Sequence, residues 1–389
     1  MKRILSIVSL LLVTILISSC SKNNTNKDKL IIKDMNISHE TKFGGIYIEI
    51  TIDDFNKKGF AFGDSLEITF SNGYKLMDLP YYNGYYTNTG EALLVGYPGY
   101  PFIRAGINNG NDLWLISGVS DSDKATITLN EKAKYLPIQE ALDIHYSDTQ
   151  GDTPDQVFGN FRNVKVGNLK DNILYRSASP ADNQHKRAQV VDRLMGDKIN
   201  TIINLSDSPT ELKEHTEKED FNSPNFLSIY NKENVIALSM NMNFTSTLDD
   251  KVPRLFMEFK NTIFQDKLIQ GLRFMINHDG PYLVHCVEGK DRTGFVCMVL
   301  EAIANASYDE IINDYMITYD NYYGISKENN PSKYTIIKEK NIDVMLKTII
   351  NDPNVDIKNC NFSTYIKAYL LDKGFTEEEY SQLENKLCK

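Results

Sequence analysis

The chain has 389 residues, which is enough for two domains, and 41% of them are hydrophobic, which is ample for buried cores. Its formal net charge at pH 7 is −10, and so acidic a balance argues against nucleic acid as a partner. The six histidines are scattered along the sequence and form no visible zinc-binding set. We therefore expect no metal and no other cofactor.

Residues 1–19 predict a targeting segment. Lys2 and Arg3 give a positive start, and the apolar run that follows is too short for a comfortable membrane span. The end of this run, Ile-Ser-Ser-Cys20, resembles a bacterial lipobox, in which the signal is cleaved before a cysteine that receives lipid. We expect an exported lipoprotein, anchored to the outer face of the cell membrane through Cys20, with residues 20–29 as a flexible tether. An ordinary signal peptide or a short anchor helix is the alternative.

Residues 30–136 have the composition of a small, mostly β domain. The segments 46–52 and 65–70 are rich in β-branched and aromatic residues, and 113–116 and 125–129 predict two further strands. Three Asn-Gly pairs predict the turns between strands. We expect a small barrel or sandwich.

Six tyrosines crowd among glycines between Tyr81 and Pro101. Tyrosine stacks and forms hydrogen bonds, so a binding face for sugar or for a partner is one interpretation. Packing within a small β domain is the other interpretation, and the one we favour.

Residues 137–157 read as a linker. Pro137 ends the β-rich texture, and residues 147–154 are polar and rich in turn formers. The segment is also compatible with a hinge that packs back near an active site.

Residues 158–389 alternate between predicted strands and helices, as an α/β domain does. The predicted strands are 201–205, 235–239 and 282–284, and the predicted helices are 185–195, 209–217, 255–276, 308–319, 332–350, 364–371 and 376–387.

The most informative stretch is Tyr282–Gly294. It predicts a strand, a short loop and a helix, with Cys286 and Arg292 in the loop. Successive N–H groups at a helix N-terminus form an anion site, and an arginine fork holds two phosphate oxygens at once. A helix N-terminus and nearby cations favour the thiolate form of a cysteine, and a thiolate there is a nucleophile toward phosphorus. The predicted phosphate-binding residues are Val287, Glu288, Gly289, Lys290, Asp291, Arg292 and Thr293.

Neighbouring residues have supporting roles in this prediction. Gly289 permits a backbone angle that other residues resist. His285 is expected to orient the cysteine backbone, and the Thr293 hydroxyl to bond the sulfur of Cys286.

The string from His285 to Gly294, His-Cys-Val-Glu-Gly-Lys-Asp-Arg-Thr-Gly, resembles the signature of cysteine-dependent protein tyrosine phosphatases. Its second half resembles the bacterial branch, which includes members acting on phosphoinositides. Asn-Phe-Arg-Asn163 and Leu-Tyr-Arg-Ser177 are similar to two further motifs of that branch. The resemblance implies an α/β phosphatase domain over residues 158–389, with a central, mostly parallel sheet flanked by helices.

The resemblance also implies a general acid, an Asp that follows a buried strand. Asn204 stands at that position here and has no titratable proton to donate. Asp207, three residues further on, is our candidate, and its alternative role is to cap the helix that follows. Asp291 is the second candidate, and its alternative role is to hold the loop or Lys290 in place.

Two basic residues have two interpretations each. Lys290 either contacts the substrate phosphate or a second anionic group, or it is a solvated loop lysine. Arg176 either lines the pocket or holds the core together. Among the other cysteines, Cys297 is expected in the core, and Cys360 and Cys388 are possible disulfide partners.

These features predict a phosphomonoester hydrolase that works through a cysteinyl-phosphate at Cys286, most simply a protein tyrosine phosphatase. The expected partners are a phosphotyrosine protein or a phosphoinositide as substrate, and the membrane through the lipid on Cys20. The alternatives are a phosphoinositide phosphatase, a phosphate-binding pseudo-enzyme and an adhesion lipoprotein.

Overall fold

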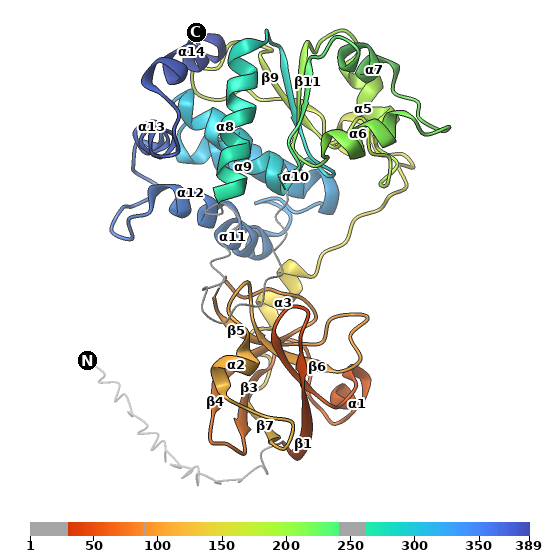
Figure 1. Cartoon of the computed structure of the whole chain (residues 1–389), viewed down its shortest axis with the longest axis vertical. Helices are drawn as coiled ribbons and strands as arrows, with labels where there is room; N and C mark the ends of the chain where they lie inside the picture. The colour runs from red at the N-terminus through yellow and green to blue at the C-terminus, as the bar shows by residue number, and fades with distance from the viewer. Residues whose placement is uncertain (1–29, 89, 241–261) are drawn as a thin grey trace, which may run out of the picture.

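The computed structural model describes residues 30–88, 90–240 and 262–389. The predicted signal segment, the tether and Cys20 lie outside the described residues, as does the first part of the helix predicted from residue 255. Figure 1 shows a β-rich lobe formed by the first third of the chain and a larger lobe of helices around a sheet. No helix within the described ranges is long and apolar enough to cross a membrane.

Seven strands of the first lobe close into a barrel, in the order β1-β2-β6-β5-β4-β3-β7. All neighbouring strands are antiparallel except β4 and β5, which are parallel. Closure removes the exposed edges that an open sheet of this size would leave. The elements are β1 (Ile31–Glu40), β2 (Gly45–Ile48), α1 (Ile52–Lys57), β3 (Ser65–Phe70), β4 (Lys75–Tyr82), β5 (Ala92–Val95), β6 (Ile103–Ile107), α2 (Leu113–Ser117) and β7 (Lys124–Glu131).

Two strand predictions in this lobe were wrong. Residues 113–116 lie in helix α2, because the Asp112 carboxylate accepts the Trp114 N–H and Gly118 supplies a left-handed C-terminus. The strand predicted over 46–52 ends at Ile48, and Thr51 caps helix α1 instead. In both places a local capping residue overrides the β propensity of its neighbours.

The tyrosine-rich segment serves packing to a large extent. Tyr81 and Tyr82 are buried, and the ring of Phe55 packs edge-on against Tyr81. The hydroxyls of Tyr85 and Tyr100 lie 2.7 Å apart, and the buried Arg104 donates to the Tyr85 hydroxyl. The packing interpretation therefore accounts for the inner members of this segment.

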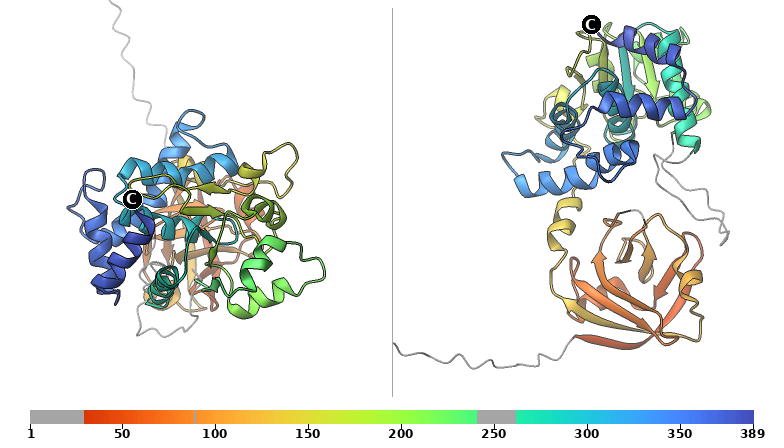
Figure 2. Two further views of the ribbon diagram at one scale, coloured as in Figure 1. Left: turned by 90° about the horizontal axis from the view of Figure 1, so that it is seen from above. Right: turned by 90° about the vertical axis from the view of Figure 1, so that its left-hand side faces the viewer.

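The predicted linker is folded. Pro137 lies in the first turn of helix α3 (Leu136–Leu142), which packs against α11 (Pro331–Lys340) of the second lobe. Figure 2 shows α3 between the barrel and the C-terminal helices. Asn83 of the barrel bonds to Gln139 and Asp143, so α3 contacts both lobes.

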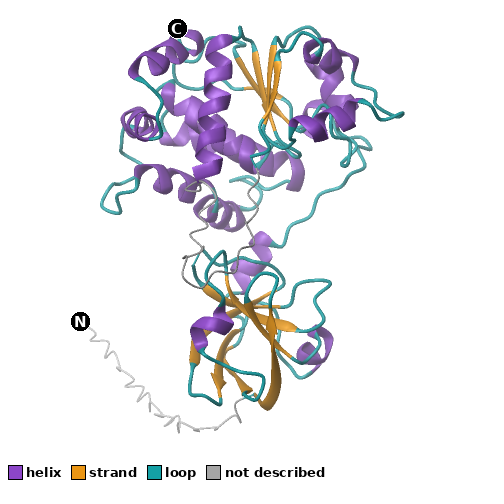
Figure 3. Cartoon of the chain, viewed as in Figure 1, coloured by secondary structure: helices purple, strands orange, loops and turns teal. Residues whose placement is uncertain are grey.

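The second lobe is built on a five-stranded sheet in the order β11-β10-β12-β9-β8. The pairs within β11-β10-β12-β9 are parallel, and β8 is antiparallel to β9. Figure 3 shows helices on both sides of these strands. The strands are β8 (Arg162–Asn163), β9 (Leu174–Ser177), β10 (Thr201–Asn204), β11 (Val235–Ala237) and β12 (Tyr282–His285). The helices are α4 (Asp155–Phe158), α5 (Ala188–Met195), α6 (Pro209–Thr216), α7 (Pro224–Tyr230), α8 (Thr262–Asn277), α9 (Asp291–Ile303), α10 (Tyr308–Tyr323), α11 (Pro331–Lys340), α12 (Ile342–Ile350), α13 (Phe362–Asp372) and α14 (Glu377–Leu387). The helix predicted over 332–350 is thus two helices, which meet at Asn341.

The register of the sheet sets the position of the site. Ser177, Asn204 and His285 are paired across β9, β12 and β10, and each is the last residue of its strand. The segments that follow these residues therefore begin at the same edge of the sheet. Ligands of open α/β sheets bind at this edge.

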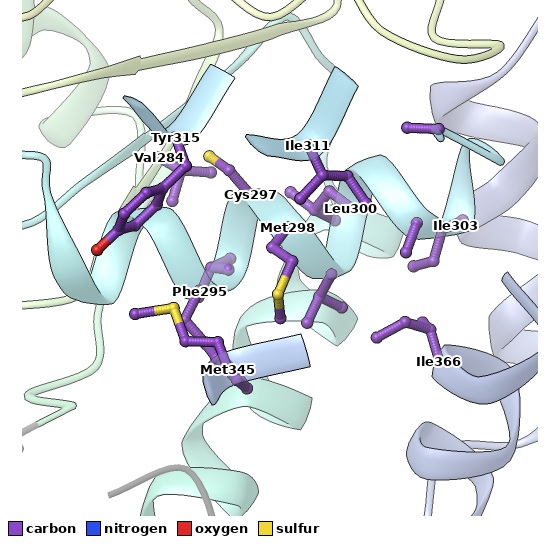
Figure 4. Close-up of a cluster of buried hydrophobic side chains, with 14 of the residues drawn as sticks. Val284, Phe295, Cys297, Met298, Leu300, Ile303, Ile311, Tyr315, Met345 and Ile366 are labelled. Atoms are coloured by element: carbon purple, nitrogen blue, oxygen red, sulfur yellow. The ribbon is translucent and has the colours of Figure 1, made fainter. Parts of the chain in front are cut away.

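Helix α9 forms the centre of the larger core and is buried from Thr293 to Ile303. In Figure 4, Phe295 and Met298 of α9 lie among Tyr315, Met345 and other side chains from the surrounding helices. Fully burying each such side chain contributes roughly 1.5–3 kcal/mol. The helix that begins at the predicted phosphate loop is therefore held on all sides.

Candidate active site

The segment 286–290 connects β12 to α9 and forms the predicted loop. Gly289 has φ +69°, and a Cβ at this position would lie 2.1 Å from the carbonyl oxygen of Ser177. Glycine is therefore required by the backbone angle and by the close approach of strand β9. The left-handed residue that the sequence predicts is present.

The carbonyl groups of residues 287–290 all accept hydrogen bonds, those of 287–289 from other segments and that of Lys290 from the first turn of α9. Val287 O accepts from Ser179 N at 3.1 Å, Glu288 O from the Tyr322 hydroxyl at 2.6 Å, and Lys290 O from Gly294 N at 2.8 Å. Gly289 O accepts from Arg176 Nη2 at 3.0 Å and from an amide side chain. Among the described residues no acceptor is found for the backbone N–H groups of 287–292. Because the loop carbonyls are bound by these donors, the amides of 287–292 are available to bind an anion.

Four ionisable groups, three of them buried and Arg162 partly exposed, form a cluster that supports the signature loop. Arg176 and Arg162 both donate to the Asp314 carboxylate of α10, and Glu301 of α9 lies beside it. Burial alone would raise the pKa of Asp314, but the two guanidiniums hold it well below its usual range. Burial and the neighbouring Asp314 charge raise the pKa of Glu301, so Glu301 is protonated. The cluster fixes Arg176, which is 1% exposed, against the loop carbonyls. Arg176 therefore holds the structure together, and the alternative that it lines the pocket was wrong.

Asn160 is a second support, from the segment before β8. Its Nδ2 donates to Gly289 O at 3.2 Å and to Thr318 Oγ1 at 3.1 Å, and its Oδ1 accepts from Arg162 and Asn321. Its φ of +48° is one that Asn tolerates better than most residues. This contact explains why the motif Asn-Phe-Arg-Asn163 accompanies the loop.

Cys286 is buried at the start of the loop. The ring of His285 is fully buried, and its Nδ1 lies 3.4 Å from Cys286 O, as expected for a residue that orients the cysteine backbone. Burial and the nearby Arg292 charge lower the pKa of His285 to about 3, so the imidazole is neutral. The Thr293 hydroxyl is buried and has no hydrogen-bond partner among the described residues. The predicted bond from Thr293 to the sulfur is therefore not made in this structure.

Lys290 is not a solvated lysine. Its ammonium lies 3.0 Å from a Glu288 carboxylate oxygen, 3.8 Å from Asp291 and 3.3 Å from the Tyr323 hydroxyl. Burial would lower its pKa, but Asp291 and the other neighbours raise it well above the usual value. One part of the interpretation of Asp291 thus agrees with the structure, since Asp291 does lie beside Lys290.

Asp207 lies on the loop after β10, next to the loop that carries Cys286. Leu205 N donates to His285 O at 2.9 Å, which joins the two segments. Asn204 Nδ2 donates to Asp207 Oδ2 at 2.8 Å, and His215 Nε2 lies 3.9 Å from Oδ1. Burial raises the pKa of Asp207 even though the Asn204 bond lowers it. Ser208, not Asp207, caps the following helix through a capping box, so the capping alternative for Asp207 was wrong.

The region that contains this site is similar to known proteins. A family model described as "Tyrosine phosphatase family" matches residues 158–389, which are 232 of the 389 residues. The chain belongs to the tyrosine phosphatase family. It is therefore a phosphatase of the cysteine type, whose predicted nucleophile and arginine lie in the matched region.

Solved structures give distant matches to this phosphatase. The core catalytic domain of the PP-IP phosphatase SIW14 from S. cerevisiae, in complex with citrate, is 20% identical, with 49% of this chain and 91% of that chain covered and a TM-score of 0.25. A second structure of the Siw14 catalytic core is 18% identical, with 50% and 90% covered and a TM-score of 0.26. No curated protein matches the chain.

Several residues of the phosphatase site were not predicted from the sequence. Asp314 and Tyr322 lie about two turns apart on α10, a helix that follows the signature; Asp314 contacts Arg176, and Tyr322 contacts the loop. Tyr146 of the predicted linker packs at 5.1 Å on Tyr322 and hydrogen-bonds to the Glu288 carboxylate. The periodic acidic and aromatic residues of α10 were the available signal, but nothing in them indicated the distant partner. Cys297 is in the core as predicted, and Cys360 and Cys388 are free thiols.

Proposed function

We propose that this phosphatase hydrolyses phosphotyrosine in proteins through a cysteinyl-phosphate formed at Cys286. The observation that carries the proposal is the loop itself. Its carbonyls accept hydrogen bonds from neighbouring segments and from the first turn of α9, while six consecutive N–H groups, together with the half-buried Arg292, are left for an anion. Such an array of donors fits a phosphoryl group, whose charged oxygens become equatorial in the transition state.

The proposed reaction has two steps. In the first, the Cys286 thiolate attacks phosphorus, the bond from phosphorus to the phenolic oxygen breaks, and the leaving oxygen takes a proton from a general acid. In the second, water attacks the cysteinyl-phosphate, gives up a proton to the same group, and the thiolate departs. The loop N–H groups and Arg292 stabilise the charge on the phosphoryl oxygens in both steps.

We assign the general acid to Asp207 rather than Asp291. Burial raises the pKa of Asp207, which favours the protonated form that an acid needs, and its loop is bonded to the strand end that precedes Cys286. Asp291 is the first residue of α9, and its carboxylate forms an ion pair with the Lys290 ammonium at 3.8 Å. Asn204, in place of an Asp, donates to Asp207 and so positions it.

A phosphoinositide is the second candidate substrate, because Lys290 provides a cation within the loop. Its ammonium is already within 4 Å of two carboxylates, so a second phosphate group would have to displace them. This is the reason why we rank phosphotyrosine first.

We further propose that the chain is an exported lipoprotein of the bacterial branch, anchored through Cys20. The support is the sequence of residues 1–20 alone. Metabolic labelling with a fatty-acid analogue tests this. We expect label on the wild type and none on Cys20→Ala, and equal labelling of both would refute the anchor.

Hydrolysis of para-nitrophenyl phosphate by residues 21–389, with EDTA present, tests the enzyme mechanism. We expect turnover in EDTA that is abolished in Cys286→Ser while phosphate or phosphopeptide still binds. Undiminished turnover in Cys286→Ser would exclude the cysteinyl-phosphate. Turnover that depends on added metal would exclude the metal-independent mechanism.

A further inference from the structure

A cavity of about 230 Å³ lies on the Asp207 side of the proposed active site, outside the signature loop. One wall is the segment after β9, a second is the end of α6, and the third is the segment before α7. The lining residues are Ala181, Asp182, Asn183, Gln184, Ala188, Gln189, His215, Lys218, Asp220, Phe221, Asn222 and Ser223. The volume is below the range of sites for whole small molecules and suits a single side chain.

Two contacts connect the segments around this cavity with the signature loop and with Asp207. The segment that leads into the cavity is bonded to the loop, since Ser179 N donates to Val287 O, and the Asp182 charge raises the pKa of Asp207. His215 lines the cavity and also lies 3.9 Å from Asp207. The segments that border the cavity therefore also contact the signature loop and Asp207.

The polar groups of the cavity favour a cation. Asp182 and Asp220 contribute two carboxylates, and Asn183, Gln184 and Asn222 contribute amide oxygens. Asp182 uses Oδ1 for the N–H of Gln184, and Asp220 has no hydrogen bond or ion pair to another described residue. The one cationic residue that lines the cavity, Lys218, already bonds to His215 Nδ1 at 3.0 Å. A second phosphate group would meet two carboxylates there, whereas a guanidinium would find matching acceptors.

We propose that this cavity is a specificity subsite for an arginine or lysine side chain adjacent to the phosphotyrosine of a peptide substrate. The inference rests on the proposed function and deepens it, because it selects a basic phosphotyrosine peptide over a phosphoinositide. Asp182 and Asp220 act as specificity-determining residues, and neither takes part in the chemical step.

Binding to the Cys286→Ser chain and turnover by the wild type test this together. The probes are two phosphotyrosine peptides that differ only in carrying Arg or Glu on both sides of the phosphotyrosine, and an inositol phosphate headgroup. Because Asp182 is partly exposed and Asp220 is exposed, ion pairs to them are weak, and we expect a preference of roughly 3- to 10-fold for the Arg peptide, in Kd and in kcat/KM. Asp220→Asn, and Asp182→Asn with it, should bring the ratio toward one. Asp197→Asn, an exposed Asp at the other end of the sheet, is the matched control and should keep the ratio.

The outcomes separate the two proposals. Turnover of both peptides with equal Kd values, or with the Glu peptide preferred, would overturn the subsite and leave the phosphatase proposal intact. Tighter binding of the inositol phosphate than of either peptide, lost in Lys218→Ala, would also overturn it. Preferred binding of the Arg peptide by Cys286→Ser, with no turnover by the wild type, would support the subsite and refute the enzyme.

Discussion

The substitution Asp314→Asn tests the cluster that supports the signature loop. The carboxylate accepts from Arg162 Nε at 2.9 Å and from Arg176 Nη1, and its main-chain oxygen accepts from Arg162 Nη2. The amide would keep one oxygen acceptor, lose the negative charge and present an NH₂ group to a guanidinium. Removing one partner of a buried ion pair costs about 3–5 kcal/mol.

Glu301 reduces this cost. It is protonated in the wild type because it is buried and because Asp314 beside it is charged. In Asp314→Asn that charge is gone and two arginines remain, so the pKa of Glu301 falls and its carboxylate becomes the counter-ion. We therefore expect Asp314→Asn to lower the free energy of unfolding by about 2–3 kcal/mol, and the double variant with Glu301→Gln to lose at least about 2 kcal/mol more than the sum of the single variants.

Urea unfolding of the four proteins at pH 7 measures these free energies. The rate on para-nitrophenyl phosphate measures the loop, because a displacement of about 1 Å at the reacting groups costs about 100-fold. Asp309→Asn, an exposed Asp in the first turn of α10, is the matched control and should change stability by less than about 0.5 kcal/mol. Additive losses in the double variant would refute the exchange of counter-ions. A fully active, stable Asp314→Asn would refute the supporting role of the cluster.

Three further variants test other parts of the site. Asp207→Asn should lower kcat on phosphotyrosine peptide by roughly 10²–10⁴-fold and abolish the fall in kcat at high pH, because Asp207, whose pKa is raised by burial, must be protonated to act as an acid. The groups that face Asp207 are Asn204, His215, Asp182 and Glu211. An unchanged pH profile would exclude Asp207 as the acid. Gly289→Ala should cost more than about 2 kcal/mol in urea unfolding and abolish turnover, whereas Gly324→Ala, with a similar φ and no atom within 4 Å, should cost about 1 kcal/mol, and equal losses would show that the clash with Ser177 is relieved. Tyr146→Phe should cost about 1 kcal/mol in the same assay, because the Glu288 carboxylate loses a bond, and no change would refute that contact.

The local parts of the site could be predicted because their reasons lie within a short stretch. A strand, a left-handed glycine and a helix N-terminus are encoded by adjacent residues between Tyr282 and Gly294, and all are present. Gly289 is the clearest case, since its φ and its distance from Ser177 both forbid a side chain.

The supports of the loop could not be predicted, because each is a contact between distant segments. Arg176 and Asp314 are 138 residues apart, and no local pattern around either residue indicates that they pair. The capping alternative for Asp207 was wrong: Asp and Ser are both good caps, and the choice of Ser208 depends on Glu211 completing the capping box. The segment 113–116 was misread for a related reason, because β propensity reports burial more than backbone preference.

The segment between the barrel and the phosphatase region owes its fold to one buried charge. The guanidinium of Arg187 is 3% exposed, donates to the carbonyl oxygens of Phe158 and Ser147 and to the Asp148 carboxylate, and lies over the rings of Tyr146 and Tyr322. If the segment detached, Arg187 would lose the Ser147 carbonyl, the Asp148 carboxylate and the Tyr146 ring. Because Tyr146 and Tyr322 also bond to Glu288 of the loop, the connection between the lobes forms part of the wall of the site. Its turn-rich composition therefore reflects a bound, extended path across the phosphatase surface.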